Sequence, residues 1–245
     1  MRSSRSYILT IIVAIACSWV ARTWVLEPYR IPSEAMFPAL LPGDTVLVNK
    51  LTYSKQSSPG NLDAMLGDLV VFESPRDRGK QYIKRIVGLP GQKIRIEEGA
   101  LWINGTSRTV YSPQDSSKGS SSGDPKKKCG TESLANQNSS SNTPILSYEV
   151  CAERPTLHLN GEIQVPVGHV FVVGDLRSSS LPGGSHYISA AGEDLGPRGW
   201  GIIPVSKLVG RAEWVWLSVS TDLPNSSLLS RIRWSRFLTR LNSRK

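Results

Sequence analysis

An uncharged, apolar run near the N-terminus sets the first limit on this chain. It extends from Ser6 to Ala21 and follows Arg2 and Arg5. Continued to Leu26, it reaches about the 20 residues that an α-helix needs to span a bilayer. Positive charge on its N-terminal side predicts that this end is cytoplasmic and that the rest of the chain is exported. We therefore expect residues 1–27 to form a single-pass transmembrane anchor.

A cleaved export signal is the alternative interpretation of the same run. Ala14-Ile15-Ala16 has small residues at the spacing of an export cleavage site, and with Cys17 it also resembles a lipoprotein cleavage site. In either case the main domain lies outside the cytoplasm. Only the uncleaved anchor would hold the residues around position 35 within about ten residues of the membrane.

Short β-rich runs separated by Gly and Pro turns follow the anchor. Prolines break any helix before Gly43, so Tyr29 to Ala35 is expected to be extended. Further strands are expected at 44–50, 68–73, 81–87, 93–97, 101–103, 165–173 and 212–219. This pattern predicts a mainly β barrel or sandwich over residues 28–111 and 148–220.

Two other regions differ in composition from this β domain. Residues 112–147 are rich in Ser, Asn, Gly and Lys, and they hold too few large apolar side chains to fold alone, which predicts a low-complexity, disordered or loosely held insertion. Residues 221–245 place apolar side chains near helical spacing with arginines between them. That pattern is typical of a basic amphipathic helix on an anionic membrane, although a solvated helix fits it too.

The charge distribution and the cysteines narrow the classes of function. The net charge is +9, but six of those charges lie in the last fifteen residues, so we expect no nucleic-acid-binding surface. Cys129 and Cys151 could pair in an oxidising compartment, or remain free thiols. The three histidines lack metal-ligand spacing and no phosphate-binding Gly loop is present, so neither a metal nor a cofactor is expected.

Four blocks in order resemble the type I signal peptidase family. Pro32-Ser33-Glu34-Ala35-Met36-Phe37-Pro38 is similar to the nucleophile motif Pro-Ser-x-Ser-Met-x-Pro, with alanine at the position of the reactive serine. The blocks are Ile31 to Leu40, Gly43 to Lys50, Tyr82 to Gly91, and Gly174 to Arg177 with Arg198 to Pro204. Together with the apolar run, they cover most of the chain outside the insertions and the tail.

The resemblance implies acyl transfer by a Ser–Lys dyad, in which a neutral lysine takes the proton of the serine hydroxyl. It assigns Ala35 to the nucleophile position and Lys84 to the general base, although Lys84 taken alone could be an ordinary surface lysine. Burial would lower the pKa of Lys84. An acid against it would form an ion pair and restore its charge, so we expect no Asp or Glu there. Arg85 is expected on the opposite face of the strand.

Other site residues are implied by the same resemblance. Ser33 and the backbone N–H of Ala35 would form the oxyanion hole. Ser180 would orient the lysine. Asp175, Arg177 and Arg198 would brace the site structurally.

The departures from the family pattern surround this one site. Besides Ala35, they are Leu176 for Asn, Gln92 for an acid, and Gly196-Pro197 before Arg198. Several changes together indicate natural relaxation of catalysis, whereas a lone alanine would indicate an introduced substrate trap. On a strand, Ser33 would share a face with residue 35 and could be a surrogate nucleophile, but it would lie roughly 6–7 Å away.

Three functions are therefore weighed. The first is membrane-bound removal of signal peptides from exported preproteins, in a bacterial plasma membrane or a thylakoid-type membrane. The second is a catalytically inactive relative that binds leader peptides or a partner peptidase. The third is a lipid-anchored β protein acylated at Cys17. The partners expected are signal peptides and the lipid bilayer.

Overall fold

A large antiparallel sheet forms the centre of the computed structural model, which describes residues 7–14, 25–54, 65–74, 79–111, 127–135, 144–153, 161–177, 200–220 and 227–241. The strand order is β1-β2-β15-β3-β4-β12-β14, and β16 pairs with β15. The strands are β1 (Leu26–Arg30), β2 (Asp44–Asn49), β3 (Leu69–Glu73), β4 (Gln81–Gly88), β12 (His169–Val173), β14 (Trp200–Pro204), β15 (Leu208–Ser218) and β16 (Thr239–Arg240). The prediction of a mainly β domain is confirmed.

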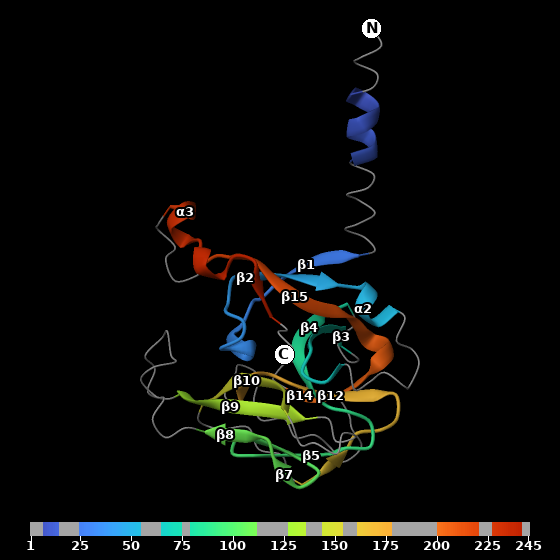
Figure 1. The fold of residues 1–245 in the computed structure, drawn as a ribbon, viewed down its shortest axis with the longest axis vertical. Helices are drawn as coiled ribbons and strands as arrows, with labels where there is room; N and C mark the ends of the chain where they lie inside the picture. The colour runs from blue at the N-terminus through green and yellow to red at the C-terminus, as the bar shows by residue number, and fades with distance from the viewer. Residues whose placement is uncertain are drawn as a thin grey trace.

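Two smaller sheets complete the domain and lie on the side of the large sheet away from the N-terminal helical residues (Figure 1). One has the order β13-β10-β9-β8, the other β11-β5-β6-β7. Their strands are β5 (Lys93–Glu97), β6 (Ala100–Ile103), β7 (Thr106–Ser107), β8 (Thr109–Tyr111), β9 (Lys127–Ala135), β10 (Pro144–Glu153), β11 (Ile163–Gln164) and β13 (Leu176–Arg177).

Apolar side chains pack on both faces of the large sheet. In β3, Val70 and Phe72 belong to the core shared with β5, β6, β12 and β14. Leu69 and Val71 belong to the second core, which contains Met36 and residues of β2 and β15. A strand buried on both faces reads as a continuous apolar run, as the sequence of β3 does.

The expected disordered insertion at 112–147 is wrong for the part of it that the structure describes. Strand β9 lies within it, and β10 begins in it; the two strands pair in antiparallel register. Leu134 is fully buried, and so is Glu132, whose charge is matched by a buried arginine. Composition was misleading because ion pairing and a disulfide hold this segment in place of a large apolar content. Residues 112–126 and 136–143 lie outside the described residues.

The basic tail does not form the expected amphipathic helix in its described part, residues 227–241, which we call the C-terminal arm. Helix α3 (Leu228–Arg231) has four residues, a 3₁₀ turn η4 spans Trp234–Arg236, and β16 then joins the sheet. The helical prediction failed because two arginines of the arm bind acceptors on the β domain, which fixes a different backbone path.

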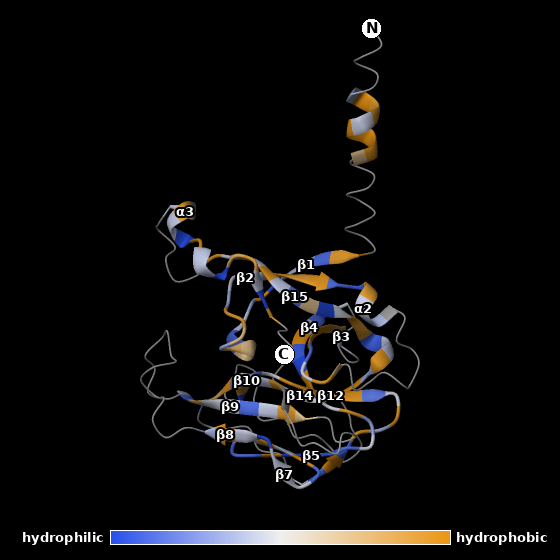
Figure 2. Ribbon diagram, viewed as in Figure 1, coloured by the Kyte–Doolittle hydropathy of each residue, from blue (hydrophilic) through white to orange (hydrophobic). Residues whose placement is uncertain are grey.

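The N-terminal run is only partly described. Residues 7–14 are helical and mostly hydrophobic, as their colour in Figure 2 shows. Their apolar side chains are exposed. Among the residues that the structure describes, no helix is long and apolar enough to cross a bilayer. The boundary of the expected anchor at residue 27 falls inside β1, and residues 15–24 lie outside the described part of the chain.

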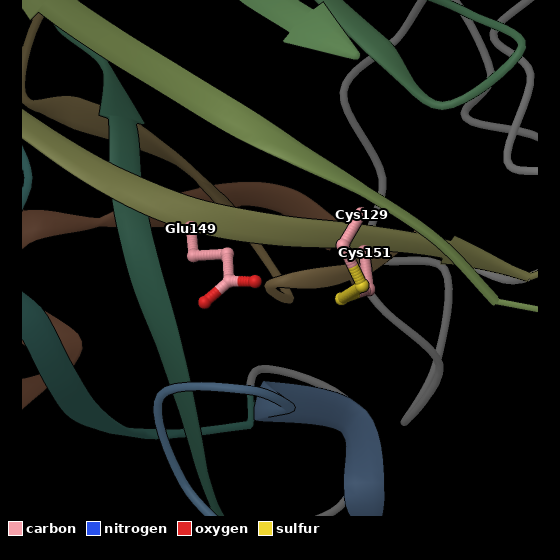
Figure 3. Close-up of side chains that lie close together, drawn as sticks. All are labelled: Cys129, Glu149 and Cys151. Carbon is pink, nitrogen blue, oxygen red and sulfur yellow. A yellow bond between two sulfur atoms is a disulfide. The ribbon is translucent and has the colours of Figure 1, made fainter. Parts of the chain in front are cut away.

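A disulfide joins β9 to β10 through Cys129 and Cys151, which resolves the alternative left open by the sequence (Figure 3). Both cysteines are buried in a small cluster with Phe37 and Leu176. Glu149 lies beside them, close enough for the three residues to resemble a metal-binding group, but sulfurs bonded to each other are not thiolate ligands. The bridge therefore supports the segment that carries residue 37.

We predict that the double variant Cys129→Ser/Cys151→Ser unfolds with a free energy lower by roughly 3 kcal/mol, because the bridge closes a loop in the unfolded chain. Urea denaturation of the full chain in detergent measures this. Cys17→Ser is the control and should leave the midpoint unchanged. Equal midpoints for the double variant and the parent would contradict the prediction.

Candidate functional site

Residue 35 lies in a short helical turn, not in a strand. Strand β1 ends at Arg30, and the 3₁₀ turn η1 spans Glu34–Met36. Ala35 and Met36 are buried, and the N–H of Phe37 donates to the Glu34 carbonyl at 2.8 Å. The turn is the local solution because Met36 must reach the second core while flanking prolines exclude a longer helix.

This turn overturns the premise for Ser33 as a surrogate nucleophile. Ser33 precedes η1 with extended backbone, and its side chain is exposed. The alternation that would place residues 33 and 35 on one face applies to a strand. The expectation of extended chain through Ala35 is therefore wrong, and with it the distance inferred from strand geometry.

Lys84 lies on β4 and is brought to the turn that carries Ala35. Its side chain is buried, with 4% exposure. Gly174, which follows β12, marks the meeting point: a Cβ added there would lie 2.5 Å from the Ala35 carbonyl oxygen and 3.4 Å from Lys84 Nζ. Any larger residue would force these groups apart, so the glycine permits the close approach of three separate segments.

Burial dominates the electrostatics of Lys84. Loss of solvation lowers the pKa of Lys84 to about 8, and attraction from Asp175 partly opposes this shift. The expectation concerned an acid in direct contact that would restore the charge of Lys84; Asp175 opposes the shift but leaves the pKa lowered. The carboxylate of Asp175 is held by Arg85, whose Nε and Nη2 donate to it at 2.8 and 2.6 Å. Arg85 therefore competes with Lys84 for the negative charge.

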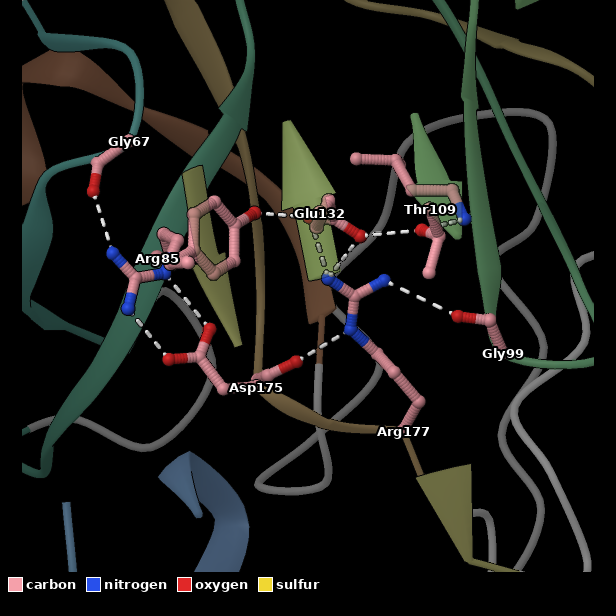
Figure 4. A network of polar contacts seen from close by, with 10 residues as sticks. Gly67, Arg85, Gly99, Thr109, Glu132, Asp175 and Arg177 are labelled. Atoms are coloured by element: carbon pink, nitrogen blue, oxygen red, sulfur yellow. Dashed lines mark hydrogen bonds and ion pairs between the residues drawn. The ribbon is translucent and has the colours of Figure 1, made fainter. Parts of the chain in front are cut away.

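Arg177 organises the other half of a buried polar network (Figure 4). Its Nε donates to the Gly174 carbonyl at 2.7 Å, and its Nη2 donates to both carboxylate oxygens of Glu132 at 3.0 Å. Glu132 also accepts hydrogen bonds from Thr109 Oγ1 and the Tyr148 hydroxyl. The network fixes Gly174, and so the backbone opposite Lys84.

Tyr148 connects the two halves of this network. The Arg85 guanidinium lies 3.9 Å from the centroid of its ring. Burial, followed by the negative charge of Glu132, raises the pKa of Tyr148 well above its ordinary value, so the hydroxyl remains a donor. Asp175 and Arg177, which the resemblance gave as bracing residues, both lie in this buried network.

Sequence reasoning missed four side chains of the network, those of Arg85, Thr109, Glu132 and Tyr148. Arg85 does lie on the face opposite Lys84 in a regular strand, but it is buried and paired rather than exposed. Glu132 and Tyr148 lie in or beside a segment taken for an insertion. The available signal for Glu132 was its place in a stretch of β-like alternation. It is a single acid there, two residues before Leu134. The predicted residues Ser180 and Arg198 lie outside the described part of the chain.

A buried lysine with a lowered pKa is the kind of base that can activate a serine hydroxyl, and here it lies near a turn that carries an alanine. Comparisons with known proteins are more specific. A family described as "Signal peptidase, peptidase S26" matches residues 4–217. The chain belongs to the signal peptidase I family.

Curated relatives span most of the chain. Signal peptidase I of Pseudomonas fluorescens is 32% identical over 87% of this chain and 74% of its own length. That of Pseudomonas aeruginosa is 31% identical over 85% and 72%, and the probable signal peptidase I-1 of Synechocystis is 26% identical over 90% of both. A solved signal peptidase I from Enterococcus faecalis aligns with 60% of this chain and 93% of its own at 24% identity and a TM-score of 0.29, which supports no argument about the fold.

We predict that the titration of Lys84 contributes to the pH dependence of the free energy of unfolding. Its folded pKa of about 8 lies below the ordinary 10.5, so between these values the folded state binds fewer protons than the unfolded state. The free energy of unfolding should therefore gain a rising component from about pH 8 upward, and lose it as the pH falls through 8.

Urea denaturation at several pH values compares the parent with Lys84→Met, which lacks this component. Lys207→Met, which removes an exposed lysine, is the matched control and should keep it. Parallel pH curves for the parent and Lys84→Met would count against a lowered pKa.

Proposed function

We propose that this chain is a membrane-bound member of its family that binds the signal peptides of exported preproteins without hydrolysing them at a significant rate. The observation that carries this proposal is the side chain of residue 35: a methyl group occupies the buried turn beside Lys84. Loss of the nucleophile in a serine hydrolase lowers turnover on the order of 10⁶-fold, while binding groups remain.

The roles of the surrounding groups follow from this proposal. Lys84 would be the general base in an active relative, because a pKa of about 8 leaves a useful neutral fraction. The Ala35 backbone N–H and the Ser33 hydroxyl would donate to the oxyanion. Ser180 would orient Lys84, and Asp175, Arg177 and Arg198 would brace the site.

Signal peptide hydrolysis is the second candidate, and the retained Lys84 favours it. Placing a lysine in a site that lowers its pKa from 10.5 to about 8 destabilises the fold by about 3 kcal/mol at neutral pH. Such a group suits proton transfer, which is the chemistry of the active family. It has no use in this chain unless a hydroxyl is available to it.

The decisive comparison is Ala35→Ser. We expect the parent to bind a preprotein with small residues one and three positions before the cut, but not to cleave it in detergent. Ala35→Ser should cleave it, at a rate that rises with pH through about 8 as Lys84 loses its proton. The parent cleaving as fast as Ala35→Ser would refute the proposal.

Two further variants give this experiment its controls. Ala35→Ser/Lys84→Met should bind without cleaving, which assigns the proton transfer to Lys84. Ala35→Thr would test whether any hydroxyl suffices. Binding of an active peptidase in place of the leader peptide would support the partner form of the inactive relative.

Membrane association has support at both ends of the chain. Residues 7–14 expose apolar side chains, and the C-terminal arm lies on the same side of the large sheet as they do (Figures 1 and 2). Trp216, Trp234 and Phe237 are partly exposed and in ring contact, and Arg240 lies over Trp214. Aromatic and basic side chains together favour the headgroup region of an anionic bilayer. The N-terminal run would be the anchor, with the main domain extracytoplasmic.

We expect brominated lipid to quench part of the tryptophan fluorescence of the full chain in anionic proteoliposomes. Trp234→Phe should reduce the quenched intensity, because that ring would lie in the interface. Trp102→Phe is the control, since Trp102 lies on β6 in a sheet on the far side. An equal loss of quenched intensity in both variants would argue against contact through the arm.

A further inference from the structure

The C-terminal arm folds back along β15 toward the segment that carries residue 35. The Arg233 N–H donates to the Ser218 carbonyl at 2.9 Å, and the Leu241 N–H donates to the Glu213 carbonyl at 2.8 Å. Strand β16 pairs with Trp214 and Val215 of β15. The arm is therefore part of the folded domain rather than an appendage.

Arg236 extends from this arm to two acceptors that follow the turn η1. Its Nη2 donates to the Ala39 carbonyl at 2.9 Å and to Asp44 Oδ2 at 2.6 Å, and its Nε donates to Asp44 Oδ1 at 3.3 Å. Arg233 adds a bond from Nη1 to the Pro42 carbonyl at 3.1 Å. Two arginines thus hold the chain between residues 39 and 44.

Asp44 relays this contact to both ends of the loop. Its carboxylate is fully buried and accepts the Leu41 N–H at 2.9 Å. Its carbonyl accepts the Ile31 N–H at 2.8 Å, so the same residue ties the chain before η1. Phe37 and Leu40, which follow Ala35 in the chain, are buried. The geometry of the turn therefore depends on where Asp44 is held.

We propose that Arg236 is a positioning residue for the turn that carries residue 35, acting through Asp44 and the Ala39 carbonyl. The use of this turn in peptide binding rests on the proposed function above; the positioning itself does not. Arginine suits the position because its planar fork meets both carboxylate oxygens and a carbonyl at once, which a lysine ammonium cannot match.

Hydrogen exchange of the full chain in detergent tests the positioning directly. In Arg236→Gln, amides between residues 37 and 44 should exchange about tenfold faster, because a charged hydrogen bond to a buried carboxylate is lost. Amides of β4 should be unchanged. Affinity for a fluorescent leader peptide should fall about tenfold as well.

Two variants separate positioning from general stability. Arg236→Lys should partly restore slow exchange and binding, because it keeps a positive charge beside the Asp44 carboxylate. Arg231→Gln is the matched control: Arg231 lies on the same arm but binds the Ser220 carbonyl, away from the turn, and its loss should leave residues 37–44 and peptide affinity unchanged.

The inference is overturned if residues 37–44 exchange in Arg236→Gln as in the parent, or if exchange rises equally in β4, as general destabilisation would produce. It is also overturned if Arg231→Gln gives the same local change. A parent protein that binds no leader peptide would refute the proposed function alone, since exchange still decides the positioning.

Discussion

Two buried ion pairs hold the domain together around its site. Arg85 pairs with Asp175, and Arg177 pairs with Glu132; all four side chains are almost completely buried. Burying four charges is costly unless each is paired and hydrogen-bonded, so neither pair tolerates the loss of one member. The Asp175 carbonyl also accepts the Cys151 N–H at 3.0 Å, which joins β10 to the same short segment. These contacts therefore fix the sheet β13-β10-β9-β8 and Gly174 together.

That constraint decides the state of Lys84. Asp175 is close enough to raise the pKa of the lysine, but its carboxylate already accepts two hydrogen bonds from Arg85. Desolvation is then the larger effect, and the pKa of Lys84 stays lowered, at about 8. A buried lysine with a lowered pKa costs the fold stability, and local violations of stability rules are typical of functional sites. The residue beside this lysine, at position 35, is an alanine, whose side chain carries no hydroxyl.

Much of the fold could be read from period and turn chemistry, and the failures share one cause. β3, β4, β5 and β12 follow from apolar runs or alternation, which depend on local sequence. The strand β9, the turn η1 and the path of the arm depend instead on distant partners: Glu132 needs Arg177, and Arg236 needs Asp44. No local pattern encodes such pairings. Lys84 and Asp175 were placed by family resemblance, whereas the pairing of Asp175 with Arg85 needed the three-dimensional structure.

Described segments near both ends of the chain join neighbouring strands of the large sheet. The chain from the N-terminal apolar helix enters β1, and β1 and β15 both pair with β2. The arm that follows β15 presents Trp234 and Phe237 outward, while Arg236 between them points to Asp44. A force on those aromatic side chains would therefore be transmitted toward the turn that carries residue 35 through two guanidinium groups, those of Arg236 and Arg233. The same alternation of outward rings and inward arginine explains why a tail that looks amphipathic in sequence is not a helix: its basic face is occupied by the domain itself.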